Sequence, residues 1–139
     1  MERLQGIAVS PGIAIGEALI LGNEGFRIPR RFLPRDAVEE ELLRLEKAFQ
    51  ASEGEVERNR KHVSEQLGDE YAAIFSAHLQ MLRDQRLHDE IEEMIRVRHY
   101  SPEYAVSRAL RRYAKVFQSL QGKYMAERAN DIFDIEKRI

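Results

Sequence analysis

The spacing of hydrophobic residues changes abruptly along this chain. Residues 4–21 are rich in Ile, Val, Leu, Ala and Gly, and a Ser-Pro-Gly turn at 10–12 interrupts them. From residue 36 onward, apolar residues instead recur every three or four positions among charged ones. Short apolar runs around a turn are typical of strands, and the second spacing is typical of amphipathic helices. We therefore predict strands at about 4–9 and 14–21, followed by helices.

The helical part is predicted to form antiparallel hairpins. A capping box at Asp36 and Glu39 begins the first helix, and Gly68 ends it. Ser101-Pro102 is another start signal, because serine caps helices and proline is tolerated in their first turn. The predicted helices cover about residues 36–67 and 69–82, then run from Asp84 through Ile95, from Pro102 to Gly122, and from about Tyr124 onward.

The fold class is therefore mainly α, a bundle of four or five helices in antiparallel hairpins with a short N-terminal β strand pair. An isolated strand pair is only marginally stable in water. The pair either packs against the helices or joins a sheet whose other strands are encoded beyond residue 139. We favour the second interpretation, in which the strands belong to an otherwise missing α/β domain.

Composition narrows the function classes. The 22 Lys and Arg residues nearly balance the 24 Asp and Glu residues, for a net charge of −2. This balance argues against attachment to nucleic acid or to an anionic membrane through bulk charge. The absence of cysteine excludes disulfides, thiolate metal sites and cysteine nucleophiles. With no apolar run of about 20 residues and no signal-like start, we expect an intracellular protein.

No complete active site is recognisable from residue spacing. The histidines form neither a metal-binding pair four residues apart nor a Glu-x-x-His motif, so no metal site is predicted. They are His62, His78, His88 and His99. A row of cations on one helix flank is either a nucleic-acid surface or a solvated face. It consists of Arg108, Arg111, Arg112 and Lys115.

The helix predicted at 69–82 carries a second apolar strip formed by Ala73, Ala77 and Met81. Small residues let another backbone approach closely, and methionine adapts to the shape of a partner. The strip is therefore a docking surface for a partner, a seam between two copies of the chain, or an internal packing position.

Three segments, in order and in register, resemble enzyme I of the bacterial phosphotransferase system. Residues 6–16 read GIAVSPGIAIG, like the opening of that family. Residues 73–82, AIFSAHLQML, resemble its AIF-x-x-H-x-x-x-L helix, and residues 124–132, YMAERANDI, resemble its Y-x-x-E-R-A-x-D segment. The resemblance covers essentially the whole chain.

The resemblance implies a cytoplasmic phosphoenolpyruvate–protein phosphotransferase. In that family a histidine accepts phosphate from phosphoenolpyruvate, with magnesium in a C-terminal barrel domain, and passes it to the carrier protein HPr for sugar transport. The phosphorylated histidine lies in a glycine-rich segment that none of the four histidines here matches. The resemblance thus implies a piece without a catalytic residue or cofactor of its own, and a full-length homodimer formed through the absent C-terminal domain.

The resemblance also implies a division of the chain and a docking surface. Residues 1–32 would be the leading strands of the phosphohistidine domain with a connector, and residues 33–139 the helical domain that binds HPr. No nucleic acid or membrane partner is expected. Family positions, together with the apolar strip, predict carrier contacts at Asp69, Glu70, Ala73, Ala77, His78, Met81, Asp84, Leu87, Tyr124, Arg128 and Asp131.

The chain departs from the family pattern at positions that bear on this docking. Ser76, Gln85 and Arg86 stand where the family is often acidic. Glu136 stands where the family usually has glycine. The carrier could therefore be HPr of the sugar branch, a paralogue of the nitrogen branch, or a carrier with an altered surface.

Overall fold

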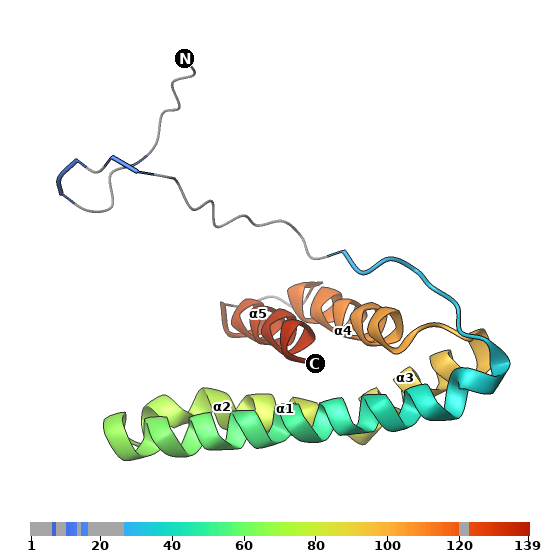
Figure 1. The fold of residues 1–139 in the computed structure, drawn as a ribbon. Helices are drawn as coiled ribbons and strands as arrows, with labels where there is room; N and C mark the ends of the chain where they lie inside the picture. The colour runs from blue at the N-terminus through green and yellow to red at the C-terminus, as the bar shows by residue number, and fades with distance from the viewer. Residues whose placement is uncertain (1–6, 8–10, 14, 17–26, 120–122) are drawn as a thin grey trace.

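The computed structural model describes residues 7, 11–13, 15–16, 27–119 and 123–139, without the side chains of 123–126. Within these residues the mainly helical prediction is confirmed (Figure 1). The predicted strand pair lies almost entirely outside the described residues, and Ile7, Ile15 and Gly16, which are described, belong to no strand. The elements are a 3-10 turn η1 (Arg35–Ala37) and the helices α1 (Val38–Leu67), α2 (Asp69–Leu82), α3 (Gln85–Arg98), α4 (Pro102–Ser119) and α5 (Lys123–Arg138).

The long helix α1 organises the bundle. Its 30 residues span about 45 Å at 1.5 Å per residue, twice the length of α2 or α3. The chain turns back after α1, so α2 packs along its second half and α3 along its first half, while α4 and α5 lie side by side over them (Figure 1). The fold is thus built of antiparallel neighbours, as predicted.

Two of the predicted helix ends are found in the structure, and one is not. Gly68 ends α1 with φ of 99°, and its N–H donates to the Ser64 carbonyl at 3.0 Å. Asp84 caps α3, since its carboxylate accepts from the Leu87 N–H at 2.9 Å. The predicted capping box at Asp36 is wrong. The chain enters α1 through η1, which begins after Pro34, so Asp36 lies inside that turn and makes no capping hydrogen bond.

The core lies between the two layers of helices. Its largest fully buried side chains are Val56, Leu82, Ile91, Ile95 and Ile135. Three apolar residues lie exposed at the tip of the α1–α2 hairpin, which projects beyond α5 in Figure 1. There Leu67, Tyr71 and Ile74 are 63%, 65% and 45% exposed. Their spacing points them to one side of the hairpin, but no described helix covers that side.

The connector before η1 is fastened to the opposite end of the bundle. Phe32 and Tyr100 form an isolated antiparallel bridge, and their rings lie 5.6 Å apart. The Leu33 N–H donates to the His99 carbonyl, and the Ser101 N–H donates to the Arg31 carbonyl. The connector therefore meets the turn between α3 and α4, where His99 adopts a left-handed conformation that ends α3.

Candidate interaction surface

The residues predicted as carrier contacts come from α2, the start of α3 and α5. Asp69, Glu70, Ala73 and Asp84 are exposed, whereas Ala77, Met81 and Arg128 are half-buried. The side chain of Tyr124 lies outside the described residues. Three others are buried, with exposures of 6%, 3% and 7%: they are His78, Leu87 and Asp131. The predicted set is thus an exposed acidic and apolar face above a buried layer.

A small apolar cleft of about 170 Å³ lies in this region. It lies where the end of α2 and the start of α3 meet α4 and α5. Of the predicted contacts, Met81, Asp84 and Leu87 line it. Sequence reasoning missed the other side of the cleft, which consists of Leu110, Tyr113, Phe117 and Ile132. Their helical spacing is the same as that of core residues, so only the three-dimensional arrangement shows that they border an opening.

Two acidic and two basic side chains lie beside this cleft. Burial raises the pKa of Tyr113, and the carboxylates of Glu90 and Asp84 raise it further against the opposing charges of Arg112 and Arg86. Glu90 also forms an ion pair with Arg112. The pKa of Tyr113 is therefore raised mainly by burial, and Arg86 is the cation at this rim that is not paired with a carboxylate, whereas Arg112 is paired with Glu90.

A buried polar array joins α2 to α5. The His78 Nε2 atom lies 3.5 Å from one Asp131 oxygen, and the Arg128 guanidinium donates to the other at 2.7 Å. The ring of Phe75 packs edge-on against His78 at 6.3 Å between centroids. The array fixes Arg128, the least buried of its three members, at the surface of α5. Arg128 and Asp131 are three residues apart on α5, a spacing that places their side chains next to each other on a helix.

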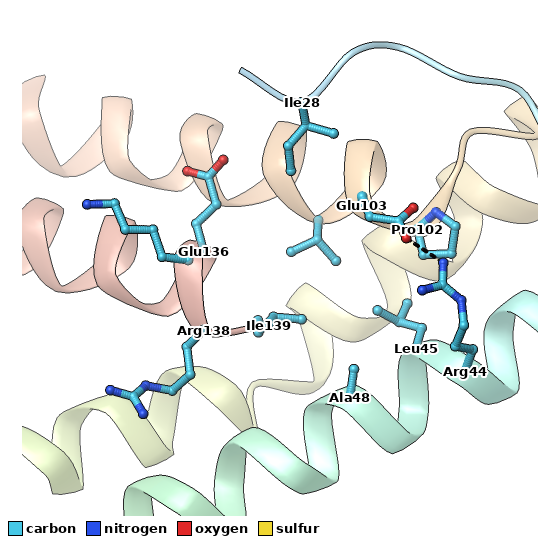
Figure 2. A pocket seen from close by; sticks show the side chains of 11 residues that line it. Ile28, Arg44, Leu45, Ala48, Pro102, Glu103, Glu136, Arg138 and Ile139 are labelled. Atoms are coloured by element: carbon cyan, nitrogen blue, oxygen red, sulfur yellow. Dashed lines mark hydrogen bonds and ion pairs between the residues drawn. The ribbon is translucent and has the colours of Figure 1, made fainter. Parts of the chain in front are cut away.

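A second cavity of about 300 Å³ lies where the connector crosses α1 and α4 near the end of α5 (Figure 2). Its apolar wall includes Ile28, Leu45 and Ile139. Two of the arginines that line it are paired with carboxylates. Arg44 pairs with Glu103 at 2.5 Å, and Arg138 pairs with Glu55. The cavity offers packing space but no convergent set of catalytic groups.

Glu136 also lines this cavity, and it is the residue that stands where the family usually has glycine. It is buried and accepts from the Ser107 hydroxyl at 2.5 Å and from Arg111 Nε at 3.0 Å. Arg112, by contrast, pairs with Glu90 on α3. Arg111 and Arg112 of the predicted row on α4 therefore pair with acidic residues of two different helices, while Arg108 donates to the Tyr104 hydroxyl, and this does not support a continuous nucleic-acid surface.

Two further properties concern the part of the chain that the structure describes. No group of three or more His, Asp or Glu side chains there is arranged to hold a metal ion. None of the described helices is both long and apolar enough to cross a membrane.

Comparison with known proteins identifies the family. Residues 5–128 match the family described as "PEP-utilising enzyme, N-terminal". The phosphoenolpyruvate-protein phosphotransferase of Priestia megaterium is 38% identical over 99% of this chain, and that of Bacillus subtilis is 34% identical over all of it. The chain spans 24% of the length of each.

Solved structures show the same relationship. A solution structure of Enzyme I superposes with a TM-score of 0.75 at 31% identity, covering 81% of this chain and 45% of that one. A structure titled "N-terminal domain of Enzyme 1 - Nitrogen" gives a TM-score of 0.73 at 25% identity, covering 80% and 45%. The resemblance to enzyme I is confirmed, and the chain belongs to the PEP-utilising enzyme, N-terminal, family.

Proposed function

We propose that this chain is the carrier-docking part of a phosphoenolpyruvate–protein phosphotransferase, and that its helical domain, residues 33–139, binds HPr. The relatives named above carry that activity in their names. The single observation that carries the docking role is the apolar cleft bordered by Met81, Leu87 and Phe117 beside an acidic face. The cleft is too small and too apolar for a substrate site with convergent polar groups.

The chemistry of this surface defines its partner. Asp69, Glu70 and Asp84 are exposed on α2 and at the turn before α3, so they favour a basic partner surface. Ala73 on the same helix leaves room for close approach. An apolar side chain of the partner would enter the cleft and serve as the anchor, since buried apolar contacts near the centre of an interface contribute most of the affinity. HPr fits because it presents a basic surface in this family.

The buried array has a supporting role in this proposal. Asp131 accepts from the Arg128 guanidinium at 2.7 Å, and His78 on α2 lies 3.5 Å from the other Asp131 oxygen. Arg128 would then meet the partner in one orientation, which lowers the entropy cost of binding. His78, Leu87 and Asp131 thus act through the residues above them, and Tyr124 remains a proposed contact.

The phosphotransfer chemistry belongs to other parts of the full-length protein. The family places the phosphorylated histidine in a glycine-rich segment that these 139 residues do not contain. We therefore propose a cytoplasmic enzyme that uses magnesium and dimerises through its C-terminal domain, with this part inactive alone. Incubation of this chain with labelled phosphoenolpyruvate and magnesium should leave every histidine unlabelled in a mass spectrum. Stoichiometric label on any of them would contradict the division of labour.

The docking surface is tested with a matched pair of arginine substitutions on α2. Ala73 and Tyr71 are both exposed but lie on opposite sides of the helix, since residues two apart do not share a face. Ala73→Arg should weaken HPr binding about tenfold or more through steric and like-charge repulsion. Tyr71→Arg should change it less than about twofold. Calorimetric titration of both variants, with circular dichroism to verify folding, measures the difference. Equal effects of the two substitutions would place the carrier elsewhere.

A further inference from the structure

An uncompensated positive cluster lies at the end of the bundle farthest from the hairpin tip. Residues 27–35 contain four arginines and no acidic residue. The bridge between Phe32 and Tyr100 ties this segment to the turn after α3, which brings in Arg98 and Arg108 from the neighbouring helices. None of these arginines forms an ion pair with a described carboxylate, whereas Arg44, Arg96 and others elsewhere do.

Three of these arginines converge on a small aromatic platform. The Arg30 guanidinium lies 5.5 Å from the centre of the Phe32 ring, which packs on Tyr100. Tyr100 in turn packs edge-on against Tyr104 at 5.0 Å, and Arg108 donates to the Tyr104 hydroxyl at 3.3 Å. The arginines come from three different segments, namely the connector, the last turn of α3 and the middle of α4.

The pKa of Tyr100 reflects the positive charge gathered at this platform. Hydrogen bonding from Arg98, joined by the charges of Arg98, Arg108 and Arg30, lowers the pKa of Tyr100 although burial opposes this. Of the carboxylates on neighbouring elements, Glu103 pairs with Arg44 and Glu39 with Arg96, while Asp36 and Glu40 form no ion pair with these arginines. The three guanidinium groups are exposed, while Tyr100 is buried beneath them. They therefore face solvent as a fixed positive group without a counter-charge.

We propose that Arg30, Arg98 and Arg108 form a binding site for a compact, multiply charged oxyanion of the phosphate or pyrophosphate type. Guanidinium groups bind phosphate oxygens through paired, charge-assisted hydrogen bonds. Convergence from three segments on one spot suits a compact anion, whereas an acidic peptide needs an extended track. The tyrosines act as positioning residues, because their rings and hydroxyls hold the guanidinium groups in place. Since Arg30 belongs to the connector, an anion bound here would fasten the connector to the bundle.

The test is a titration of the isotope-labelled full chain with inorganic pyrophosphate at constant ionic strength, followed by NMR. Saturable shifts should appear in residues 30–33 and 98–108. Arg98→Gln and Arg108→Gln should each weaken binding about two- to fivefold, the size expected for one ion pair at an exposed site. Arg58→Gln is the matched control, since Arg58 is also exposed and without an ion pair. It should bind like the unchanged protein.

Three outcomes would overturn the proposal. Shifts that never saturate, or that the Arg98→Gln, Arg108→Gln double variant retains, would mean general charge screening. A polyglutamate peptide that binds the same residues more tightly than pyrophosphate at equal charge would identify an acidic protein partner instead. A pyrophosphate-induced rise in melting temperature that persists in the double variant would place the anion elsewhere. The Ala73→Arg variant should keep pyrophosphate binding, so failure of carrier docking and failure of this site are distinguishable.

Discussion

The buried contact of Glu136 on α5 with Ser107 and Arg111 on α4 provides a test of how these two helices pack. Glu136 is 4% exposed at its side chain, and its carboxylate accepts from both Ser107 and Arg111. Arg111 is 42% exposed, so one partner of the ion pair is buried and the other is in contact with water. We consider the variants Glu136→Gln and Arg111→Met, singly and together. Both keep the length of the side chain while removing its charge.

The magnitudes follow from this uneven burial. A hydrogen bond to a charged group contributes about 1.5–3 kcal/mol, but solvent reduces the Coulomb part for an exposed partner to about 0.2–1 kcal/mol. Glu136→Gln retains an acceptor for Ser107 and should lower the free energy of unfolding by about 1 kcal/mol. Arg111→Met leaves a buried carboxylate with one donor and should cost about 1–2 kcal/mol. The coupling energy between the two should be about 0.5–1 kcal/mol.

Urea denaturation followed by circular dichroism measures all four corners of this cycle. The cycle removes contributions from the other contacts of each residue, because they cancel between the single and double variants. Ser107→Ala is the control on the second donor and should cost about 1 kcal/mol. A coupling energy below about 0.2 kcal/mol would show that Arg111 remains solvated, and would refute the reasoning that the Arg111–Glu136 ion pair joins α4 to α5.

Three further predictions concern single positions. Arg86→Glu should tighten the binding of a basic carrier a few-fold at low salt, with the gain shrinking at high salt, because Arg86 is exposed beside the cleft and, unlike Arg112, is not paired with a carboxylate. Weaker binding in calorimetry would reverse the assigned orientation. Asp84→Ala should lower the free energy of unfolding by about 1 kcal/mol through loss of the α3 cap, and an unchanged urea midpoint would show that the cap contributes nothing. Gly68→Ala should cost about 1–2 kcal/mol from strain at φ of 99° with no steric clash, and a stabilised variant would argue against that backbone conformation.

Local sequence signals predicted the helices well because those signals act within a few residues. Gly68 ends α1 and Asp84 caps the start of α3. Each acts only on its own helix, so both roles could be recognised from spacing alone. Asp36 misled because a 3-10 turn begins directly after Pro34, and the α-helix begins one residue later than the capping box implied. Leu67, Tyr71 and Ile74 show a different limit. Their spacing defines a face but does not reveal whether another helix covers it.

The candidate surface was only partly predictable for the same physical reason. The residues of α2 could be assigned from the apolar strip and from the resemblance. The far wall of the cleft comes from α4 and α5, and its residues have the spacing of ordinary core positions. The arginine cluster at Tyr100 depends on a backbone bridge to Phe32, 68 residues away in the sequence, which no local pattern encodes.

The central claim is that a basic carrier protein docks on the face formed by α2, the start of α3, α4 and α5. The most direct measurement is an NMR titration of this isotope-labelled chain with unlabelled HPr. The account predicts saturable shifts concentrated between Asp69 and Asp84 and between Leu110 and Phe117, with little change near Ile28 or Tyr100. Shifts confined to the cavity of Figure 2 or to the arginine cluster, or no saturable shifts at all, would contradict it.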